Sequence, residues 1–183
     1  VSRVLNNNAT VSPATRLKVE TAIHELNYEP SMLGRNLRNS ESRLLLVLIP
    51  NIANPFYSEI INGIQDTAIS NNYHILLCET DSNPQRENIY FNMIKNKLAD
   101  GAISMDPAVN MQKLNELAVY YPIIQCSEYD EGGVIPYVTI DNELAAYRAV
   151  KHLIKLGHER IALINVDEKF LFARQRRSGY EKA

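Results

Sequence analysis

The sequence predicts an α/β protein: a short helical segment followed by a doubly wound parallel sheet. After residue 43, apolar strand-like runs alternate with helical stretches, which is typical of parallel α/β domains. The charge balance changes at the same place. Residues 1–43 contain six Lys or Arg against four Asp or Glu, whereas the remaining residues contain 13 against 17. We therefore expect two parts with different roles.

The first part predicts two helices joined by a polar turn. Residues 1–5 resemble the end of a helix, and the asparagines at 6–8 end it because Asn tolerates turn and left-handed backbone. Ser12 followed by Pro13 predicts the next helix start, with a side-chain cap before a proline at the first helical position. That helix ends near 27–30. Its expected apolar stripe consists of Leu17, Ala22, Ile23 and Leu26, with Val19 beside it.

Residues 31–38 predict a further short helix with an unusual apolar side. Met32, Leu33 and Leu37 have almost no apolar partners nearby in the sequence. A helix of this length is not stable alone in water. The segment therefore needs another surface against which to fold.

The second part predicts six strands and five helices in alternation. The first strand, 44–49, is continuously apolar and suits a strand buried on both faces. Asn54 and Pro55 start the first helix, which runs to about residue 71, and Gly157 ends the helix 144–156. The other expected strands are 74–78, 102–105, 123–126, 138–140 and 161–166, and the other helices are 85–98, 111–120 and 173–183.

Composition excludes several classes of protein. No apolar run approaches the roughly 20 residues needed to span a membrane. Cys78 and Cys126 are far apart without a CxxC spacing, so we interpret both as small core residues and expect a reducing cytoplasm. The polar N-terminus predicts no signal peptide. Since the chain starts at Val1 and stops at Ala183 in an expected helix, we expect a fragment cut at both ends.

Ligands of open α/β sheets bind at the carboxyl ends of the strands, which predicts a small-molecule cleft here. The polar and aromatic segments at those ends are 51–57, 79–83, 106, 127–130, 141–142 and 166–169. Polar loops are also common in any α/β domain, so a cleft is one of two interpretations. For Asp141 and Asn142, a helix cap and crossover turn is favoured over ligand contact.

No pattern in the sequence predicts catalysis. Nucleophile-elbow, phosphate-binding and metalloprotease motifs are absent, and the four histidines are scattered. We therefore expect no catalytic residue, metal or cofactor. Asp81 and Asp106 follow strands, as in phospho-acceptor domains, but the first strand ends in Pro50 and Asn51 where such a domain needs an acidic pair for Mg²⁺.

The first part is better suited to DNA contact than to catalysis. Hydroxyls of Ser2, Thr10 and Ser12 can donate to phosphates, and Arg3 can reach a base edge. The alternative is an ordinary helical hairpin with a solvated arginine face. Charge alone does not separate these two interpretations.

A set of motifs in consecutive order resembles the lac repressor (LacI/GalR) family along essentially the whole chain. Residues 1–6 resemble the end of that family's recognition helix, 11–16 and 26–30 the two ends of its third helix, and 34–38 its hinge helix. Further matches are the segments 54–56, 99–101, 140–142, 156–161 and 176–180. Gly34-Arg35-Asn36 and Ser127-Glu128-Tyr129 are most similar to the cytidine-type repressor branch.

The resemblance implies a DNA-binding transcriptional repressor. A helix-turn-helix headpiece enters the major groove, and a hinge-helix leucine, matched by Leu37, wedges into a minor-groove step. Two half-sites imply a homodimer on operator DNA, which would also supply the surface that 31–38 needs. The implied DNA-contacting residues are Ser2, Arg3, Asn6, Thr10, Ser12, Arg35, Leu37 and Arg38. The implied location is the cytoplasm, on the bacterial nucleoid.

The resemblance also implies an effector between two α/β lobes that changes operator affinity. The expected effector contacts are Phe56, Tyr57, Ser127, Glu128 and Arg176. Stacking aromatics and Arg176 favour a nucleoside or sugar, although Phe56 as a plain core residue is the alternative. The implied domains are a headpiece remnant at 1–28, a hinge helix and linker at 29–43, an N-terminal lobe at 44–141, and a crossover with an incomplete second lobe at 142–183. The alternative function is a solute-binding module without DNA binding, as in the related periplasmic proteins.

Overall fold

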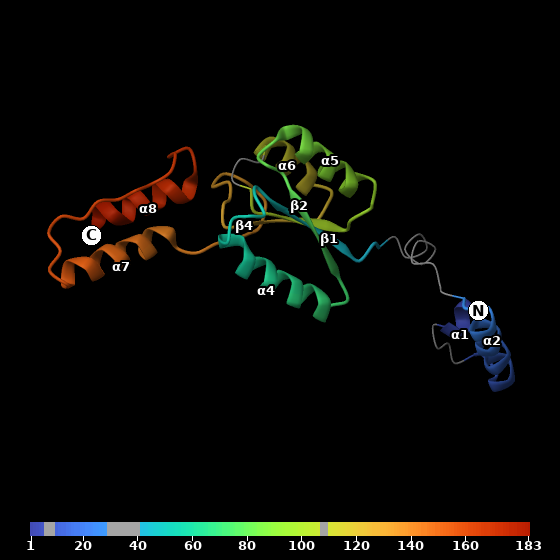
Figure 1. Cartoon of the computed structure of the whole chain (residues 1–183). Coiled ribbons are helices and arrows are strands. Elements are labelled where there is room, and N and C mark those ends of the chain that lie inside the picture. Colours follow the sequence, from blue (N-terminus) through green and yellow to red (C-terminus); the bar gives the residue numbers. More distant parts are fainter. Residues whose placement is uncertain (6–9, 29–40, 107–109) are drawn as a thin grey trace. The chain divides into compact units, whose positions relative to one another are not determined.

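The computed structural model describes residues 1–5, 10–28, 41–106 and 110–183. The chain divides into two compact units, Val1–Glu41 and Ser42–Ala183, which are described separately (Figure 1). The expected helix at 31–38, with Met32, Leu33 and Leu37, lies outside the described residues. No helix in the described ranges is long and apolar enough to cross a membrane.

The first unit contains α1 (Ser2–Leu5) and α2 (Pro13–Glu25). The predicted start of α2 is confirmed: Ser12 is the N-cap, and its Oγ accepts the Thr15 backbone N–H at 3.3 Å. The Val4 side chain is buried, and its carbonyl accepts a bond from the Arg16 guanidinium at 3.5 Å. These contacts hold α1 against α2.

The residues of the expected apolar stripe of α2 do not form a buried face. No side chain of α2 is buried, and Leu17 is 67% exposed. The physical reason is a lack of covering surface. Within the described part of this unit only the single turn of α1 packs on the thirteen-residue α2.

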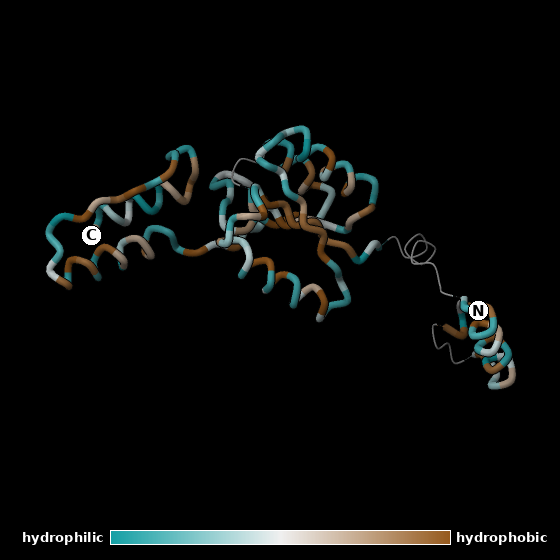
Figure 2. The backbone as a smooth tube through the Cα atoms, viewed as in Figure 1, coloured by the Kyte–Doolittle hydropathy of each residue, from teal (hydrophilic) through white to brown (hydrophobic). Residues whose placement is uncertain are grey.

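The second unit contains the predicted parallel sheet. Its strands are β1 (Leu44–Ile49), β2 (His74–Glu79), β3 (Gly101–Ser104), β4 (Ile123–Cys126) and β5 (Tyr137–Val138). They lie in the order β2-β1-β3-β4-β5, and every neighbouring pair is parallel. The central β1 is almost wholly buried, as its apolar sequence predicts. Figure 2 shows the strands of this sheet as the most hydrophobic part of the second unit.

Helices cover both faces of the sheet (Figure 1). The first, α4 (Phe56–Ser70), packs on the face formed by Val47 and Ile49, while α5 (Pro84–Lys95) and α6 (Met111–Ala118) pack on the face of Leu46 and Leu48. Alternate residues of β1 therefore enter two separate cores, because successive strand side chains point to opposite faces.

The chain continues through α7 (Asn142–Lys155) and α8 (Leu171–Lys182), which pack against each other. Asp141 caps α7 as predicted, since its carboxylate accepts the Leu144 N–H at 2.9 Å. Gly157 follows the last turn with φ +87°, as expected for a helix-ending glycine. Helix α8 begins two residues earlier than predicted.

Two strand predictions require correction. The expected strand 138–140 is a two-residue strand at Tyr137–Val138. The expected strand 161–166 is not formed, and Ile164 is 96% exposed. A strand needs a neighbour that binds its backbone groups, and none of the described strands lies beside this segment. Its apolar sequence is therefore strand-like without a sheet to join.

Candidate functional site

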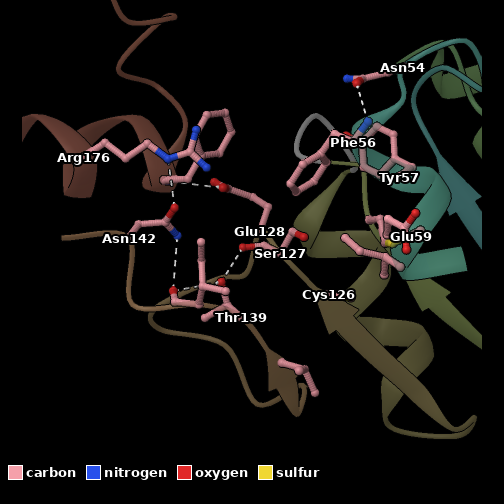
Figure 3. A pocket seen from close by; sticks show the side chains of 15 residues that line it. Asn54, Phe56, Tyr57, Glu59, Cys126, Ser127, Glu128, Thr139, Asn142 and Arg176 are labelled. Atoms are coloured by element: carbon pink, nitrogen blue, oxygen red, sulfur yellow. Dashed lines mark hydrogen bonds between the residues drawn. The ribbon is translucent and has the colours of Figure 1, made fainter. Parts of the chain in front are cut away.

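A cleft of about 760 Å³ lies at the carboxyl ends of β1, β3 and β4 and is bounded on the other side by residues of α7 and α8 (Figure 3). The connection from β1 leads to β2 on one side, whereas β3 lies on the other side. Such a reversal of strand order opens a crevice at the strand ends. All five predicted effector residues line this cleft: Phe56, Tyr57, Ser127, Glu128 and Arg176.

The first wall of the cleft is the start of α4. Asn54 Oδ1 accepts the Phe56 N–H at 3.0 Å, which fixes the turn after β1. Phe56 is 49% exposed, whereas Tyr57 is buried in the core and meets Phe56 edge to face at 5.2 Å. Burial, followed by the charges of Asp106 and Glu128, raises the pKa of Tyr57 to about 12. Tyr57 is thus the core residue of the pair, whereas the Phe56 ring is half-exposed and lines the cleft.

The opposite wall is formed by α8 and the first turn of α7. The Arg176 guanidinium lies 4.9 Å from the centre of the Phe172 ring, and its Nε donates to Asn142 Oδ1 at 2.9 Å. Asn142 in turn donates to the Ile140 carbonyl at 3.3 Å. Asn142, at the start of α7, therefore fixes the position of the arginine, while Asp141 caps the helix.

The loop after β4 turns sharply beneath this wall. Ser127 has φ +74°, a left-handed conformation that is uncommon for a residue with a side chain. The following Glu128 is only 8% exposed. Its Oε1 accepts the Leu171 N–H at 2.6 Å, and its Oε2 accepts the Phe172 N–H at 3.3 Å. Glu128 thus has a structural role at the start of α8 that the sequence did not predict.

Ten further lining residues were not among the predicted effector contacts: Asn54, Glu59, Ile60, Met105, Cys126, Val138, Thr139, Ile140, Asn142 and Phe172. The strand-end rule could have identified Met105 and Cys126. No local pattern marks Phe172, which reaches the cleft through the packing of α7 and α8. Cys126 is half-buried, and burial raises its pKa. Cys78 is buried, and burial raises its pKa to about 11.

The predicted strand-end acid Asp106 lies in a buried cluster. Its carboxylate accepts bonds from the Thr80 hydroxyl and, at 3.2 Å, from Ser82 Oγ. Asp81 pairs instead with Arg86 at 3.8 Å on the surface. The two acids do not share an open site, which disfavours the phospho-acceptor alternative. Within the described ranges, no group of three or more His, Cys, Asp or Glu side chains is placed to hold a metal ion.

The predicted DNA-contacting residues are only partly within the described structure. Ser2 and Arg3 lie in α1, and Arg3 is exposed. Thr10 is exposed, and Ser12 bonds to Thr15 as the cap of α2. The remaining predicted contacts lie outside the described residues: Asn6, Arg35, Leu37 and Arg38.

Two family descriptions match consecutive parts of the chain. "Periplasmic binding proteins and sugar binding domain of LacI family" covers residues 42–183, and "Bacterial regulatory proteins, lacI family" covers residues 1–31. The transcriptional regulator RegA of Clostridium acetobutylicum is 38% identical over 86% of this chain and 48% of its own length. The repressor CytR of Escherichia coli and catabolite control protein A of Priestia megaterium are 36% and 37% identical, over all of this chain and 54% and 56% of theirs.

The chain thus spans about half the length of the curated relatives it matches. The sequence identities to RegA, CytR and catabolite control protein A are nearly equal, so they do not single out the cytidine-type repressor branch. Among solved structures, the lac repressor dimer bound to operator is 26% identical with a TM-score of 0.81, over 99% of this chain and 56% of that one. An uncharacterised protein from Actinobacillus succinogenes is 39% identical with a TM-score of 0.72, over 78% and 53%. The chain belongs to the LacI family of bacterial regulatory proteins.

Proposed function

We propose that this chain is the DNA-contacting and effector-binding part of a transcriptional repressor. The observation that supports it best is that the five predicted effector residues line one cleft in a chain that matches both family descriptions. The relatives are named as transcriptional regulators, which agrees with a protein that is not an enzyme. A regulator of this kind acts on DNA and therefore works in the cytoplasm.

The DNA-contacting part consists of the headpiece remnant at 1–28 and the hinge and linker at 29–43. Exposed Arg3 reads a base edge, while Ser2, Thr10 and Ser12 contact phosphates. Leu37 enters a minor-groove step. The similar lac repressor structure is a dimer bound to operator, which supports a homodimer on operator DNA for this protein.

The effector is a nucleoside or a sugar. The exposed ring of Phe56 offers a stacking surface on one wall of the cleft, and Phe172 with Arg176 forms the other. Hydroxyl and amide groups of Ser127, Thr139 and Asn142 also line it. Aromatic faces combined with a few fixed polar groups suit a ring that bears hydroxyls.

Effector binding changes operator affinity because the cleft joins two lobes, 44–141 and the segment that begins at 142. Such a coupling is typically worth about 1–3 kcal/mol. The alternative, a solute-binding module without DNA function, is disfavoured because residues 1–31 match the regulator description in addition to the binding-domain description.

The test uses the full-length protein. Operator sequences are selected from random duplex DNA, and affinity for the selected site is then measured for wild type, Leu37→Ala and the matched control Leu98→Ala. Leu98 is an exposed leucine of the second unit. We expect the first substitution to weaken binding and reduce the DNA bend, whereas the control leaves both unchanged. Failure to enrich any sequence would contradict the DNA-binding proposal.

The effector part is tested by titrating nucleosides and sugars into the full-length protein, with Phe56→Ala and Arg176→Ala as cleft variants. A compound that binds wild type, changes operator affinity and loses affinity in both variants supports the proposed effector class. If no nucleoside or sugar binds wild type, the effector proposal is wrong.

A further inference from the structure

Helix α8 has no cap of its own. The residue at its N-cap position is Phe170, which makes no side-chain cap bond. Ser, Thr, Asp or Asn is usual there, because the first N–H groups of a helix have no partner within the helix. The local sequence therefore leaves the start of α8 without an acceptor.

Glu128 supplies that acceptor from a distant part of the chain. It follows β4 and lies 43 residues before Leu171, whose N–H donates to Oε1 at 2.6 Å, while Oε2 accepts the Phe172 N–H at 3.3 Å. The carboxylate is nearly buried. A negative charge at a helix N-terminus is favourable, and bonds to an ionised acceptor are among the stronger hydrogen bonds. We name these three groups the α8 anchor.

The α8 anchor holds the helix that forms one wall of the cleft. Phe172, whose N–H is part of the anchor, stacks with Arg176 one turn later. Arg176 then bonds to Asn142 at the start of α7. Phe172 and Arg176 both line the cleft, and Figure 3 shows Arg176 on the side of the cleft opposite Phe56 and Tyr57. Their places in the cleft therefore depend on where α8 lies.

We propose that Glu128 is a positioning residue: its carboxylate holds the start of α8 at the end of β4 and so keeps Phe172 and Arg176 in the wall of the cleft, and it does not bind the effector. Release of the α8 anchor lets α8 move away from β4 with Phe172 and Arg176. The proposal that this movement governs effector binding rests on the proposed function, but the anchor itself does not.

Two measurements on the protein without ligand test the anchor, with Glu128→Gln as the variant. The glutamine keeps one oxygen but turns an amide donor toward a backbone donor, so one anchor bond is lost. We expect hydrogen exchange at the first turn of α8 and alkylation of Cys126 in the cleft both to become about tenfold faster or more. Unchanged rates in the folded variant would overturn the proposal.

The matched control is Glu131→Gln. Glu131 lies in the same loop, is exposed, and pairs with Arg174 of α8 at 3.7 Å, so its substitution removes the same charge near the same helix. We expect it to leave both rates unchanged, and equal acceleration by both variants would overturn the proposal. Buried Cys78 reports global unfolding: faster alkylation of Cys126 without change at Cys78 shows local opening.

Phe170→Asp in the Glu128→Gln background tests whether Glu128 holds α8 against β4 or only caps the first turn of α8. Residue 170 has the extended backbone of an N-cap, with φ −83° and ψ 135°, so aspartate there can cap α8 locally. We expect the double variant to regain slow hydrogen exchange in α8 but to retain fast alkylation of Cys126. Recovery of both would mean that Glu128 only caps the helix, and the proposal would be wrong.

Titration with cytidine and uridine separates positioning from direct contact, because the two differ only at one edge of the base: cytidine has an amino group and an unprotonated N3, whereas uridine has a carbonyl and an N3–H. Loss of the α8 anchor weakens both by the same factor. A loss confined to one of the two would make Glu128 a direct acceptor of the cytidine amino group or of the uridine N3–H and overturn the proposal. If neither binds wild type, the nucleoside form of the proposed function fails, and the exchange and alkylation results still decide the anchor.

Discussion

Gly179 of α8 lies directly on the backbone of α7 at Glu143. A Cβ atom at Gly179 would come within 2.0 Å of the Glu143 carbonyl oxygen and 2.9 Å of the Tyr147 nitrogen. The same region is held by side chains, since Ser178 Oγ bonds to Glu143 Oε2 at 2.6 Å and Lys182 bonds to Oε1. The two helices therefore approach as closely as their backbones allow.

Gly179→Ala is expected to destabilise the second unit by about 1–3 kcal/mol, because the added methyl group meets backbone that cannot move aside. Urea unfolding monitored by circular dichroism measures the change. The matched control is Gly63→Ala on α4, where nothing lies within 4 Å of the new methyl group. There we expect a gain of about 0.5–1 kcal/mol from lower backbone entropy in the unfolded chain. Equal effects at both positions would refute the close-approach argument.

Glu87→Gln is expected to change the pH dependence of stability. Glu87 is buried, and its Oε1 has no hydrogen-bond partner among the described residues. Burial is the main reason that its pKa is raised above 4.5, and the charge of Asp106 adds to it. The folded protein keeps this proton where the unfolded chain has lost it, so the wild type loses stability as pH rises from about 4.5 toward the raised pKa.

The glutamine variant has no such loss. Its stability relative to wild type should therefore increase by about 1.4 kcal/mol per pH unit across that interval. Urea unfolding at a series of pH values from 4 to 8 measures it, and exposed Glu116→Gln is the control. A difference between variant and wild type that is constant with pH would mean that Glu87 titrates normally.

Asp100→Asn is expected to loosen the start of β1 and cost about 1–3 kcal/mol. The Asp100 carboxylate accepts the N–H and Oγ–H of Ser42 at 2.7 and 2.8 Å and the Arg43 N–H at 2.9 Å. An amide keeps one oxygen and places a donor against the remaining donors. Thermal unfolding compares this variant with Asp66→Asn, the same change at an exposed position of α4, which should have little effect.

Arg3→Ala in the full-length protein is expected to weaken operator binding by about 1–3 kcal/mol and to relax specificity at one base pair. Fluorescence anisotropy with the selected operator and its single-base variants measures both. Arg86→Ala removes an equal charge from an exposed position of the second unit and serves as control. A uniform loss across all base variants would assign Arg3 to phosphate contact instead.

The sequence predicted most of the fold because its local patterns agree with its long-range packing. The apolar run of β1, the cap Ser12 and the helix-ending Gly157 were each placed correctly. Segment 161–166 is also mainly apolar but forms no strand. An apolar sequence shows that a segment can join a sheet, but it does not show whether a neighbouring strand is present. The apolar residues of α2 remain unburied for the same reason, since the sequence pattern does not show whether another element covers them.

The cleft was predictable to the extent that strand ends define it. Ser127 follows β4 directly, and Phe56 starts the helix that follows β1, so the strand-end rule places both at one edge of the sheet. The partnership of Glu128 with Leu171, by contrast, joins residues 43 positions apart through backbone N–H groups. Every residue except proline has a backbone N–H, so the residue types at 171 and 172 do not indicate this contact.

The side chains of β1 alternate between two cores, and this alternation also determines where residues can be inserted into or deleted from the chain. Leu46 and Leu48 enter one core and Val47 and Ile49 the other, so insertion or deletion of one residue within this strand would exchange the two sets. Helix α4 would then meet side chains shaped for α5 and α6. We expect insertions and deletions among relatives to avoid β1 and to fall in largely exposed stretches such as 131–134, where side chains do not have to alternate between two cores.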